Sequence, residues 1–345
     1  NHFKSYYVKC LPQYFYNVPI NFDDEELGQL TGSFALVKIW QKRQMLRLEY
    51  DNIANTLKTK NIKFPYSYIE FAWARTAVIT RVYAVTRKIQ GAEVKDTLMV
   101  PFADMANHVI PANTHWYFNT ETDKFTVNSA KYLSQGDNLY ESYGQKCNYR
   151  YFVNYGFTVP DNPYEEVCII YNPFILGIIH NKLYQTNEDY LNFLNMTKEI
   201  FQVGYDFRQE SFQNMLQYCR KQYTNATEGN NIEGKEYKKN VEIMALNLVV
   251  KTCEILLEAF TTSIEDDLKL LKLYSLNFNE SNCINQRIGE KKLLLFFIEY
   301  FGMCINILES KDAKDIKKNL KTLKKKIIKP YMIGFIEYVN SLSSL

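Results

Sequence analysis

Two polar stretches of the chain combine residue types that can do chemistry. Residues 101–108 read PFADMANH, so an acid, an amide and an imidazole follow a short apolar run. Residues 141–148 read ESYGQKCN and contain Tyr143. A phenol with an unperturbed pKa of about 10 stays neutral at pH 7, so this tyrosine can donate and accept hydrogen bonds without adding a charge. No Ser-His-Asp or Cys-His pattern accompanies them, so the residues do not indicate a nucleophilic enzyme.

Each of these residues also has a purely structural interpretation. Asn107 and His108 fit an ordinary turn after a strand, and a Tyr-Gly pair most often ends a strand with its ring packed. Arg81 can end a helix, where a cation suits the helix dipole. Phe157 is one of 22 phenylalanines and, taken alone, is more often part of a core than a ligand wall. A functional interpretation therefore depends on several motifs occurring together.

The composition indicates a folded protein large enough for two domains. The chain has 345 residues, of which 46% are hydrophobic and 23% charged, and a prior of roughly 150 residues per domain suggests two. Its longest apolar run is the six residues 293–298, far below the roughly 20 that a transmembrane helix needs. The net charge is +3, too small to indicate nucleic acid as the partner. We expect neither a membrane span nor a nucleic-acid partner.

The cysteines favour reduced thiols over a metal or disulfide framework. They are odd in number, widely spread and without a C-x-x-C pair of the kind that zinc or redox sites use. The seven positions are Cys10, Cys147, Cys168, Cys219, Cys253, Cys283 and Cys304. A reducing compartment, the cytoplasm or the nucleus, is therefore expected, and no metal site is predicted.

Short strands and turns organise the first half of the chain. Residues 115–119 alternate with 124–127 across a polar stretch, which predicts a hairpin with a four-residue loop. Further strands are expected at 98–100 and 138–142. The clearest helix of this half is predicted at 66–81.

The second half carries helical periodicity. Between residues 246 and 260 the apolar side chains recur at i, i+3, i+4 and i+7. Residues 262–265 read TSIE and fit a capping box in which the first hydroxyl caps and the glutamate reciprocates, so a new helix should begin there. Helices are also predicted at 292–308 and 317–342, with a break or kink at Pro330. We therefore expect this half to be all-helical.

Two polar segments interrupt this pattern. Residues 221–240 lack an apolar period, which predicts a mobile loop. Seven lysines crowd one segment, where leucine and isoleucine occupy the other helix face, so we interpret them as the solvated side of an amphipathic helix, able to attract an acidic partner. They are Lys317, Lys318, Lys321, Lys324, Lys325, Lys326 and Lys329.

Taken in order, the motifs resemble the SET-domain methyltransferases of the Rubisco large-subunit methyltransferase type. In that family the signatures read approximately P-x-x-D-x-x-N-H, then Y-G-x-x-x-N, then Y/S-G-F. They are matched here at 101–108, 143–148 and 155–157. Upstream, VITR at 78–81 and YVKCLP at 7–12 are similar to the family's V-x-S/T-R and Y-x-x-x-L-P segments. These five ordered motifs make the resemblance specific.

The resemblance implies an α+β fold with two domains. FTTSIEDD at 260–267 and RIGEK at 287–291 resemble the family's helical substrate-binding domain, so almost the whole chain is covered. The expected architecture is a small-sheet, β-rich SET domain at 1–162 with a helical insert in about 1–80. An all-α substrate-binding domain with its mobile loop near 221–240 follows at 163–345.

The resemblance also implies S-adenosylmethionine as the cofactor and S-adenosylhomocysteine as its product. By resemblance, Arg81 pairs with the cofactor carboxylate and Phe157 covers the adenine. The remaining cofactor-binding residues implied are Asp104, Met105, Ala106, Asn107, His108, Tyr155 and Gly156. Tyr143 is the implied catalytic residue, holding methyl group and amine in line without a dedicated general base. No zinc is implied, because this branch closes its site with the helical domain.

The acceptor implied is a lysine side chain of a protein substrate. The position of Tyr83 is aromatic in lysine-methylating relatives and resembles Asn in histidine-methylating ones. Lys146, also assigned to the substrate, stands where histidine-methylating relatives have Arg; a lysine is a point charge rather than a bidentate fork. A histidine-directed enzyme and an inert SET-like binding module are the alternatives.

One feature departs from the family pattern. Relatives carry a Gly-rich stretch that covers part of the cofactor, whereas Gly28 and Gly32 are the only glycines before Arg81. The chain starts at Asn1 rather than Met. We therefore expect that it lacks the N-terminal part of the SET domain; loss of part of the cofactor site is the competing explanation.

Overall fold

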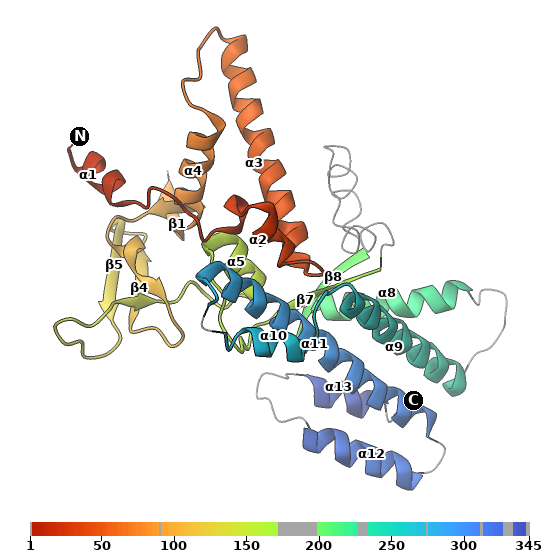
Figure 1. Ribbon diagram of the computed structural model, residues 1–345. Helices are drawn as coiled ribbons and strands as arrows, with labels where there is room; N and C mark the ends of the chain where they lie inside the picture. The colour runs from red at the N-terminus through yellow and green to blue at the C-terminus, as the bar shows by residue number, and fades with distance from the viewer. Residues whose placement is uncertain are drawn as a thin grey trace. The chain divides into compact units, whose positions relative to one another are not determined.

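The computed structural model describes residues 2–89, 91–171, 199–226, 234–273, 275–310, 313–326 and 334–342 (Figure 1). The chain divides into two compact units. The first comprises Asn1–Asn21 and Met45–Lys146, and the second Phe22–Gln44 and Cys147–Leu345. The expected domains, 1–162 and 163–345, stay a prediction, since compactness groups residues 22–44 and 147–162 with the C-terminal part.

The helices of the first unit come from the beginning of the chain. They are α1 (His2–Cys10), residues 45–59 of α3 (Phe34–Thr59) and α4 (Tyr68–Ile79). Helix α4 confirms the helix predicted at 66–81. It begins with a capping box in which the Ser67 hydroxyl accepts from the backbone N–H of Glu70, whose carboxylate accepts from that of Ser67.

The position of α4 is fixed by the N-terminal segment. Ala77 packs into a small core with Leu11, Phe15 and Val18. The indole N–H of Trp73 donates to the carbonyl of Pro12 at 2.9 Å. The helix ends at Thr80, and the chain passes directly through Arg81 into the first strand.

Three two-stranded sheets complete the first unit. Strands β1 (Val82–Ile89) and β2 (Ala92–Met99) form an antiparallel hairpin. Strands β4 (Thr114–Asn119) and β5 (Lys124–Ser129) form a second one, which confirms the predicted hairpin and its four-residue loop. The third sheet pairs β3 (Asn107–His108) with β6 (Tyr140–Glu141) in parallel.

The short parallel pair joins the two chemical motifs. Asn107 lies opposite Tyr140, and His108 opposite Glu141. The side chain of Asn113 stabilises the segment that leads into β6. It donates to the carbonyl of Asn138 and accepts from the backbone N–H of Tyr140. The predicted strand at 138–142 is thus reduced to two residues.

The second unit is mainly helical. Its described helices are α2 (Asp24–Gly28), α5 (Asn148–Tyr155), α8 (Glu210–Ala226), α9 (Lys235–Glu258), α10 (Ile264–Leu270), α11 (Phe278–Glu309), α12 (Ala313–Lys326) and α13 (Phe335–Leu342), together with residues 34–44 of α3. Helices α9 and α11 pack along each other, and their apolar faces fill the main core. The predicted helices beginning near 246 and at 292 are contained in α9 and α11.

The expectation of an all-helical second half is wrong in one place. Strands β7 (Glu166–Ile170) and β8 (Ile200–Gly204) pair antiparallel. The run from Val167 to Ile170 is buried on both faces, as expected for a short strand rich in β-branched residues. A four-residue apolar run carries no helical period that would distinguish it from a buried helix segment.

Two local predictions need correction. Helix α10 begins one residue later than predicted, because Ser263 is its cap and Asp266 reciprocates. The hydroxyl of Thr262 is instead hydrogen-bonded to Asp267 at 2.8 Å. Of the predicted mobile loop 221–240, residues 221–226 and 235–240 are helical, and 227–233 lie outside the described residues.

The two sequence motifs assigned to the helical domain meet in a buried ion cluster. Asp267 is fully buried and accepts from Arg287 and Lys291, each at 2.7 Å. Lys291 also donates to the carbonyl of Thr262 at 2.6 Å. Charges this buried are stable only when paired and hydrogen-bonded, so these residues serve to fasten α10 to α11.

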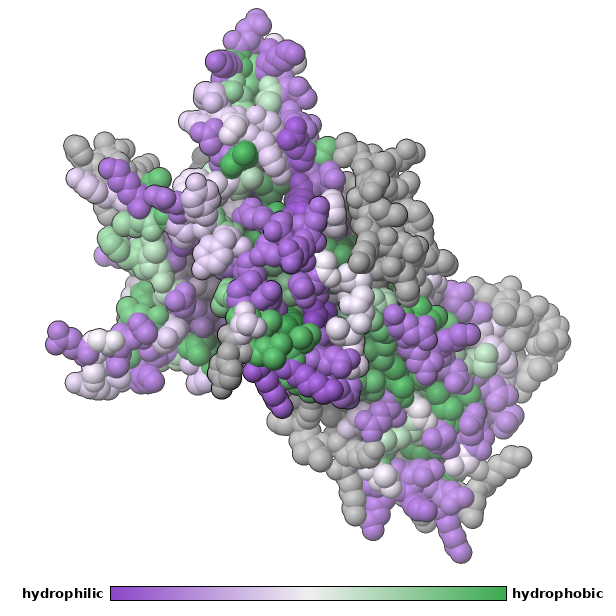
Figure 2. Space-filling model, viewed as in Figure 1, coloured by the Kyte–Doolittle hydropathy of each residue, from purple (hydrophilic) through white to green (hydrophobic). Residues whose placement is uncertain are grey.

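Helix α12 is amphipathic, as interpreted from its sequence. Leu323 is fully buried and Ile316 packs against the main core, whereas Lys314, Lys318 and Lys321 are exposed. The described part of this helix is mainly hydrophilic on its visible side (Figure 2). The predicted continuation to residue 342 is divided between α12 and α13, and the expected break at Pro330 lies outside the described residues.

Two kinds of feature are absent from the described residues. None of their helices combines the length and apolarity needed to cross a lipid bilayer. The same residues hold no group of three or more His, Cys, Asp or Glu side chains suited to a metal ion.

Candidate functional site

Tyr83 is a buried aromatic residue of the candidate site. It lies on β1, is 6% exposed, and donates its phenolic proton to the Glu141 carboxylate, whose oxygens lie 2.8 and 2.9 Å away. Its ring meets Trp116 edge-on, with centroids 5.2 Å apart, and Phe125 at 4.8 Å. Burial and the neighbouring Glu141 raise the pKa of Tyr83 well above its ordinary value, so the phenol stays protonated.

Tyr143 lies against the Asn-His motif. Its phenol donates to the carbonyl of Ala106 at 2.8 Å, and its backbone N–H donates to Nδ1 of His108 at 3.0 Å. Because Nδ1 accepts, the imidazole is in the neutral tautomer that carries its proton on Nε2. Burial also lowers the pKa of His108, which keeps it uncharged at pH 7.

Arg81 and Asp104 form the charged side of the site. The guanidinium of Arg81 donates to the Thr80 hydroxyl at 2.9 Å and lies over the Phe15 ring. The Tyr7 phenol donates to Oδ2 of Asp104. Burial raises the pKa of Asp104, while the Tyr7 hydrogen bond and the nearby Arg81 charge oppose that rise.

The remaining residues predicted within 101–146 surround this cluster. Asn107 and Met105 are exposed, and Ala106 is bonded through its carbonyl to Tyr143. The ammonium of Lys146 donates to the backbone carbonyl of Tyr143, so it supports the turn at Gly144. The first unit thus brings together the predicted residues of three segments, 81–83, 104–108 and 143–146.

The Tyr-Gly-Phe motif belongs to the second unit. Tyr155 ends α5, and Gly156 caps that helix with a φ of 79°, a left-handed conformation that glycine adopts without a steric penalty. The ring of Phe157 stacks on that of Tyr151, with centroids 5.2 Å apart. Within its own unit, Phe157 therefore has a packed ring face.

Glu141 is a buried acid of the site that sequence reasoning left without a role. Its side chain is 6% exposed, and burial raises its pKa to about 7; the Tyr83 hydrogen bond opposes the rise and the charge of Asp104 adds to it. Glu141 stands two residues before the catalytic candidate Tyr143. The sequence signal for Glu141 was an acidic residue in a predicted strand just before the Tyr-Gly motif.

Tyr7 is the second residue that sequence reasoning left without a role. It was noted only as the start of the upstream YVKCLP segment, and its phenol is bonded to Asp104, 97 positions away. Burial and Asp104 raise the pKa of this phenol. A contact over such a distance leaves no periodic signal in the sequence.

The polar atoms of the cluster fit an S-adenosylmethionine headgroup. Nε of Arg81 and Oδ1 of Asp104 are buried and have no partner among the described residues, and buried polar groups normally have one. A zwitterionic amino-acid end offers a carboxylate for the guanidinium and an ammonium for the aspartate. The free donor of Arg81 and the free acceptor of Asp104 are thus complementary to the amino-acid end of the cofactor.

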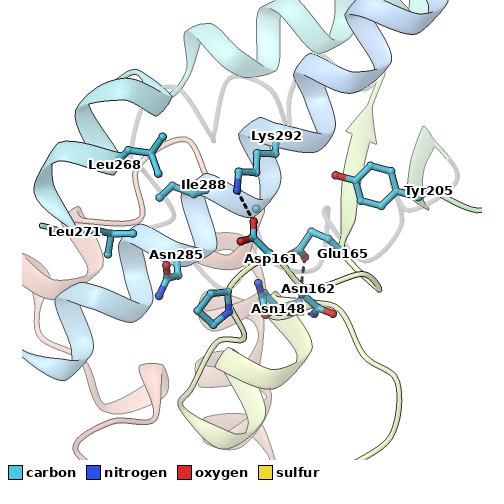
Figure 3. Close-up of a pocket in the computed structure, with 12 residues that line it drawn as sticks. Asn148, Asp161, Asn162, Glu165, Tyr205, Leu268, Leu271, Asn285, Ile288 and Lys292 are labelled. Atoms are coloured by element: carbon cyan, nitrogen blue, oxygen red, sulfur yellow. Dashed lines mark hydrogen bonds and ion pairs between the residues drawn. The ribbon is translucent and has the colours of Figure 1, made fainter. Parts of the chain in front are cut away.

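A separate cavity of about 130 Å³ lies within the second unit (Figure 3). Asp161 and Lys292 point toward each other across it and form an ion pair at 2.6 Å. Glu165, Asn148 and Tyr205 also line it. None of the residues predicted for catalysis or cofactor binding contributes to this cavity.

Comparison with known proteins places both parts of the chain. Residues 180–294 match the family model described as Rubisco LSMT substrate-binding. The chain is 24% identical over 317 residues to the actin-histidine N-methyltransferase of Canis lupus familiaris, covering 85% of this chain and 52% of the relative. The Homo sapiens protein of the same name is 23% identical over 319 residues, with the same coverage. The chain thus spans about half the length of the curated relatives it matches.

Solved structures show the fold. The SET domain of LSMT bound to lysine and AdoHcy aligns with a TM-score of 0.63 and 19% identity, covering 92% of this chain and 78% of that one. Rubisco LSMT bound to sinefungin and monomethyllysine aligns with a TM-score of 0.64 and 19% identity, covering 90% and 73%. The predicted α+β fold class, small sheets with helices followed by a helical domain, is therefore confirmed. In sequence, the chain is similar to actin-histidine N-methyltransferases, and in fold it is similar to the SET domain of LSMT.

Proposed function

We propose that this protein is an S-adenosylmethionine-dependent methyltransferase that modifies a side-chain nitrogen of a protein substrate. One observation carries the proposal: three separate stretches of the first unit bring together Arg81 and Tyr83, Asp104, and Tyr143. These side chains are buried or half-buried and lie close enough to interact electrostatically. The relatives support it, since their names describe protein methyltransferases. Solved neighbours are described as bound to AdoMet, AdoHcy or sinefungin.

The charged side of the cluster suits the cofactor. The free Nε of Arg81 and Oδ1 of Asp104 would hold its carboxylate and ammonium. Asn107 and His108 would lie along it. When bound, S-adenosylmethionine would supply a methyl group on its sulfonium sulfur for in-line attack by a nitrogen lone pair, with the C–S bond breaking and the thioether S-adenosylhomocysteine as the leaving group.

The chain's own residues must then align the acceptor and exclude water. The Tyr143 phenol is held by the Ala106 carbonyl and adds no charge. Neutral His108 fixes the backbone beside it. Both side chains are held by hydrogen bonds to the protein itself, which reduces the reorganisation needed at the moment of reaction.

We propose lysine as the acceptor. The ring of Tyr83, walled by Trp116 and Phe125, would form one side of a narrow apolar channel. Such a channel accommodates the unbranched stem of a lysine and delivers its amine to the cluster. A lysine amine has a pKa of about 10.4 and must lose a proton before attack, which burial beside a sulfonium would favour.

Histidine is the second candidate acceptor, because the curated relatives are named actin-histidine N-methyltransferases. Against histidine, this chain has Tyr83 at the position where, by resemblance, histidine-methylating relatives have Asn. Lys146 donates a hydrogen bond to the backbone carbonyl of Tyr143. A lysine also cannot bind a substrate carboxylate in the bidentate way that an arginine can.

We further propose the cytoplasm or nucleus as its location. All seven cysteines are free thiols, and all except Cys10 are buried. This usage suits a reducing compartment.

Mass spectrometry tests the function and the acceptor together. The full-length protein is incubated with cell extract or purified actin and S-adenosylmethionine carrying a trideuterated methyl group. Labelled lysine supports the proposal. Labelled histidine would retain the methyltransferase and overturn the acceptor. No labelled residue, together with no heat at millimolar cofactor in calorimetric titration, would favour an inert SET-like binding module.

A further inference from the structure

Glu141 is a buried carboxylate of the first unit, and the proposed reaction gives it no role. It lies on β6, opposite His108 of β3 and two residues before Tyr143. Only 6% of its surface is exposed. Burying a carboxylate is costly unless the group is neutralised or hydrogen-bonded, so the one side chain among the described residues that donates to it is informative.

That partner is Tyr83. Both carboxylate oxygens lie within 2.9 Å of the phenol oxygen. Trp116 and Phe125 fix the ring from its edges. A phenol has one proton, and here that proton is donated to the carboxylate. Only the lone pairs of the Tyr83 oxygen are then available to another group.

We propose that Glu141 is a positioning residue that makes Tyr83 a hydrogen-bond acceptor for the attacking nitrogen and thereby selects lysine over histidine. This inference rests on the proposed function. A neutral lysine amine carries two N–H donors beside its lone pair. Donating one of them to the Tyr83 oxygen turns the lone pair away from the phenol, toward the methyl donor.

An imidazole interacts differently with the same oxygen. Its attacking nitrogen has a lone pair and no proton, so it finds no complementary group in a Tyr83 that only accepts. A site that holds buried polar groups in one hydrogen-bonding sense discriminates strongly against ligands of the other sense. Acceptor choice would then follow from one proton on one phenol.

The direction of this hydrogen bond depends on the ionisation of Glu141. Once Glu141 is protonated, its own O–H can donate to Tyr83, and the phenol proton becomes free to turn toward the substrate. The groups facing Glu141 are Tyr83 on β1 and Asp104, which is itself bonded to Tyr7 and lies near Arg81. Burial raises the pKa of Glu141 to about 7, so selection for lysine strengthens above that pH.

The groups on the opposite side of β6 do not supply a compensating charge. His108 is neutral because burial lowers its pKa. Lys146 donates to the Tyr143 carbonyl. We therefore expect the pH dependence of lysine selection to arise from the hydrogen bond between Tyr83 and Glu141.

Carboxyl NMR of the protein labelled with ¹³C at glutamate tests the pair without turnover. One resonance should titrate near pH 7 and vanish in Glu141→Gln, which distinguishes it from other buried glutamates. In Tyr83→Phe its pKa should rise, because the hydrogen bond that favours the charged form is lost. Glu121→Gln, on the exposed hairpin loop beside Lys88, is the matched control and should leave the titration unchanged. Absence of such a resonance, or no response to Tyr83→Phe, overturns the inference.

Binding of L-lysine and L-histidine in the presence of S-adenosylhomocysteine tests the selection. At pH 8 the wild type should prefer lysine. Glu141→Leu should lower lysine affinity by about tenfold, the loss expected for one strong hydrogen bond, without changing the affinity for S-adenosylhomocysteine. Glu141→Gln provides a near-isosteric variant should leucine impair folding.

The outcomes separate this inference from the proposed function. A lysine preference that survives both substitutions removes Glu141 from its role and leaves the methyltransferase intact. Failure to bind S-adenosylhomocysteine at all contradicts the proposed function, while the Tyr83–Glu141 titration is still read directly. Equal losses of lysine and histidine affinity would show a merely structural role for Glu141.

Discussion

Tyr143, the proposed catalytic residue, is held by hydrogen bonds to uncharged groups. Its phenol is held on the Ala106 carbonyl and its ring lies beside His108, with centroids 5.3 Å apart. The motif could be recognised from the sequence because its members are close along the chain. The partner of the phenol could not, since 37 residues separate Tyr143 from Ala106.

Replacing Tyr143 by Phe should lower kcat about 10²-fold, the loss typical of one preorganised hydrogen-bonding group. The ring still packs against His108, so the affinity for S-adenosylmethionine should stay within about twofold. Steady-state kinetics and calorimetry measure the two effects. Tyr132→Phe, at a side chain that is 88% exposed, is the control. Unchanged kcat in Tyr143→Phe would remove the residue from catalysis.

Glu165 gives a pH-dependent prediction for stability. Burial raises its pKa to about 8, backbone hydrogen bonds from Asn148 oppose the rise, and nearby Glu290 adds to it. The folded state therefore binds more protons than the unfolded state between pH 4.5 and 8, so this residue's contribution to stability decreases as pH rises through that interval.

Glu165→Gln should consequently gain stability relative to the wild type from about pH 5 to about pH 8, by roughly 3 kcal/mol, and the gain should level off above that range. Urea unfolding at a series of pH values provides the measurement. Glu258→Gln, at an exposed position of α9, should show no such dependence. A difference that declines with pH would contradict the assigned protonation state.

At the scale of elements, caps decide where helices begin. Asn277 caps α11 by accepting from the backbone N–H of Glu280 at 2.9 Å, and Glu280 reciprocates at 2.8 Å. The same device begins α10, one residue away from the predicted position. Thr262 and Ser263 both offer a hydroxyl, and only the buried Asp267 determines which one is free to cap.

Asn277→Ala should lower the free energy of unfolding by about 1 kcal/mol, since a helix N-terminus loses its side-chain acceptor. Chemical unfolding followed by circular dichroism tests this. Asn247→Ala, at an exposed site within α9, should be neutral or slightly stabilising because alanine favours helix interiors. Equal effects at both sites would argue against a specific contribution of the cap.

At the scale of the whole molecule, close packing joins distant parts of the second unit. Gly32 has a φ of 88°, and a Cβ there would lie 2.6 Å from the backbone nitrogen of Phe260 and 2.7 Å from Ala259. The segment before α3 can therefore approach the end of α9 only through a glycine. Nothing near residue 32 in the sequence indicates this contact.

Gly32→Ala should destabilise the protein by about 2–4 kcal/mol, combining backbone strain with overpacking. Gly234 has a φ of 133°, and a Cβ at that residue would meet no atom within 4 Å, so Gly234→Ala should cost only about 1 kcal/mol. Thermal unfolding of the two variants compares them. Similar midpoints would mean that the chain shifts to absorb the contact.

The sequence by itself determined the local part of this protein. The hairpin at 114–129 and the helix at 68–79 follow from short-range alternation, periodicity and capping. The order of the motifs indicated the fold class. Strands β7 and β8 were not predicted, because short apolar runs carry no periodicity that identifies them as strands.

Only the tertiary structure decided which side chains meet. Tyr83 and Glu141 are 58 positions apart, and Tyr7 and Asp104 are 97 apart. Side-chain partners over such distances depend on strand register and helix packing, which are cooperative properties of the folded chain and leave no regular pattern along it. For the same reason, the ionisation of Glu141 could be inferred only once its burial was known.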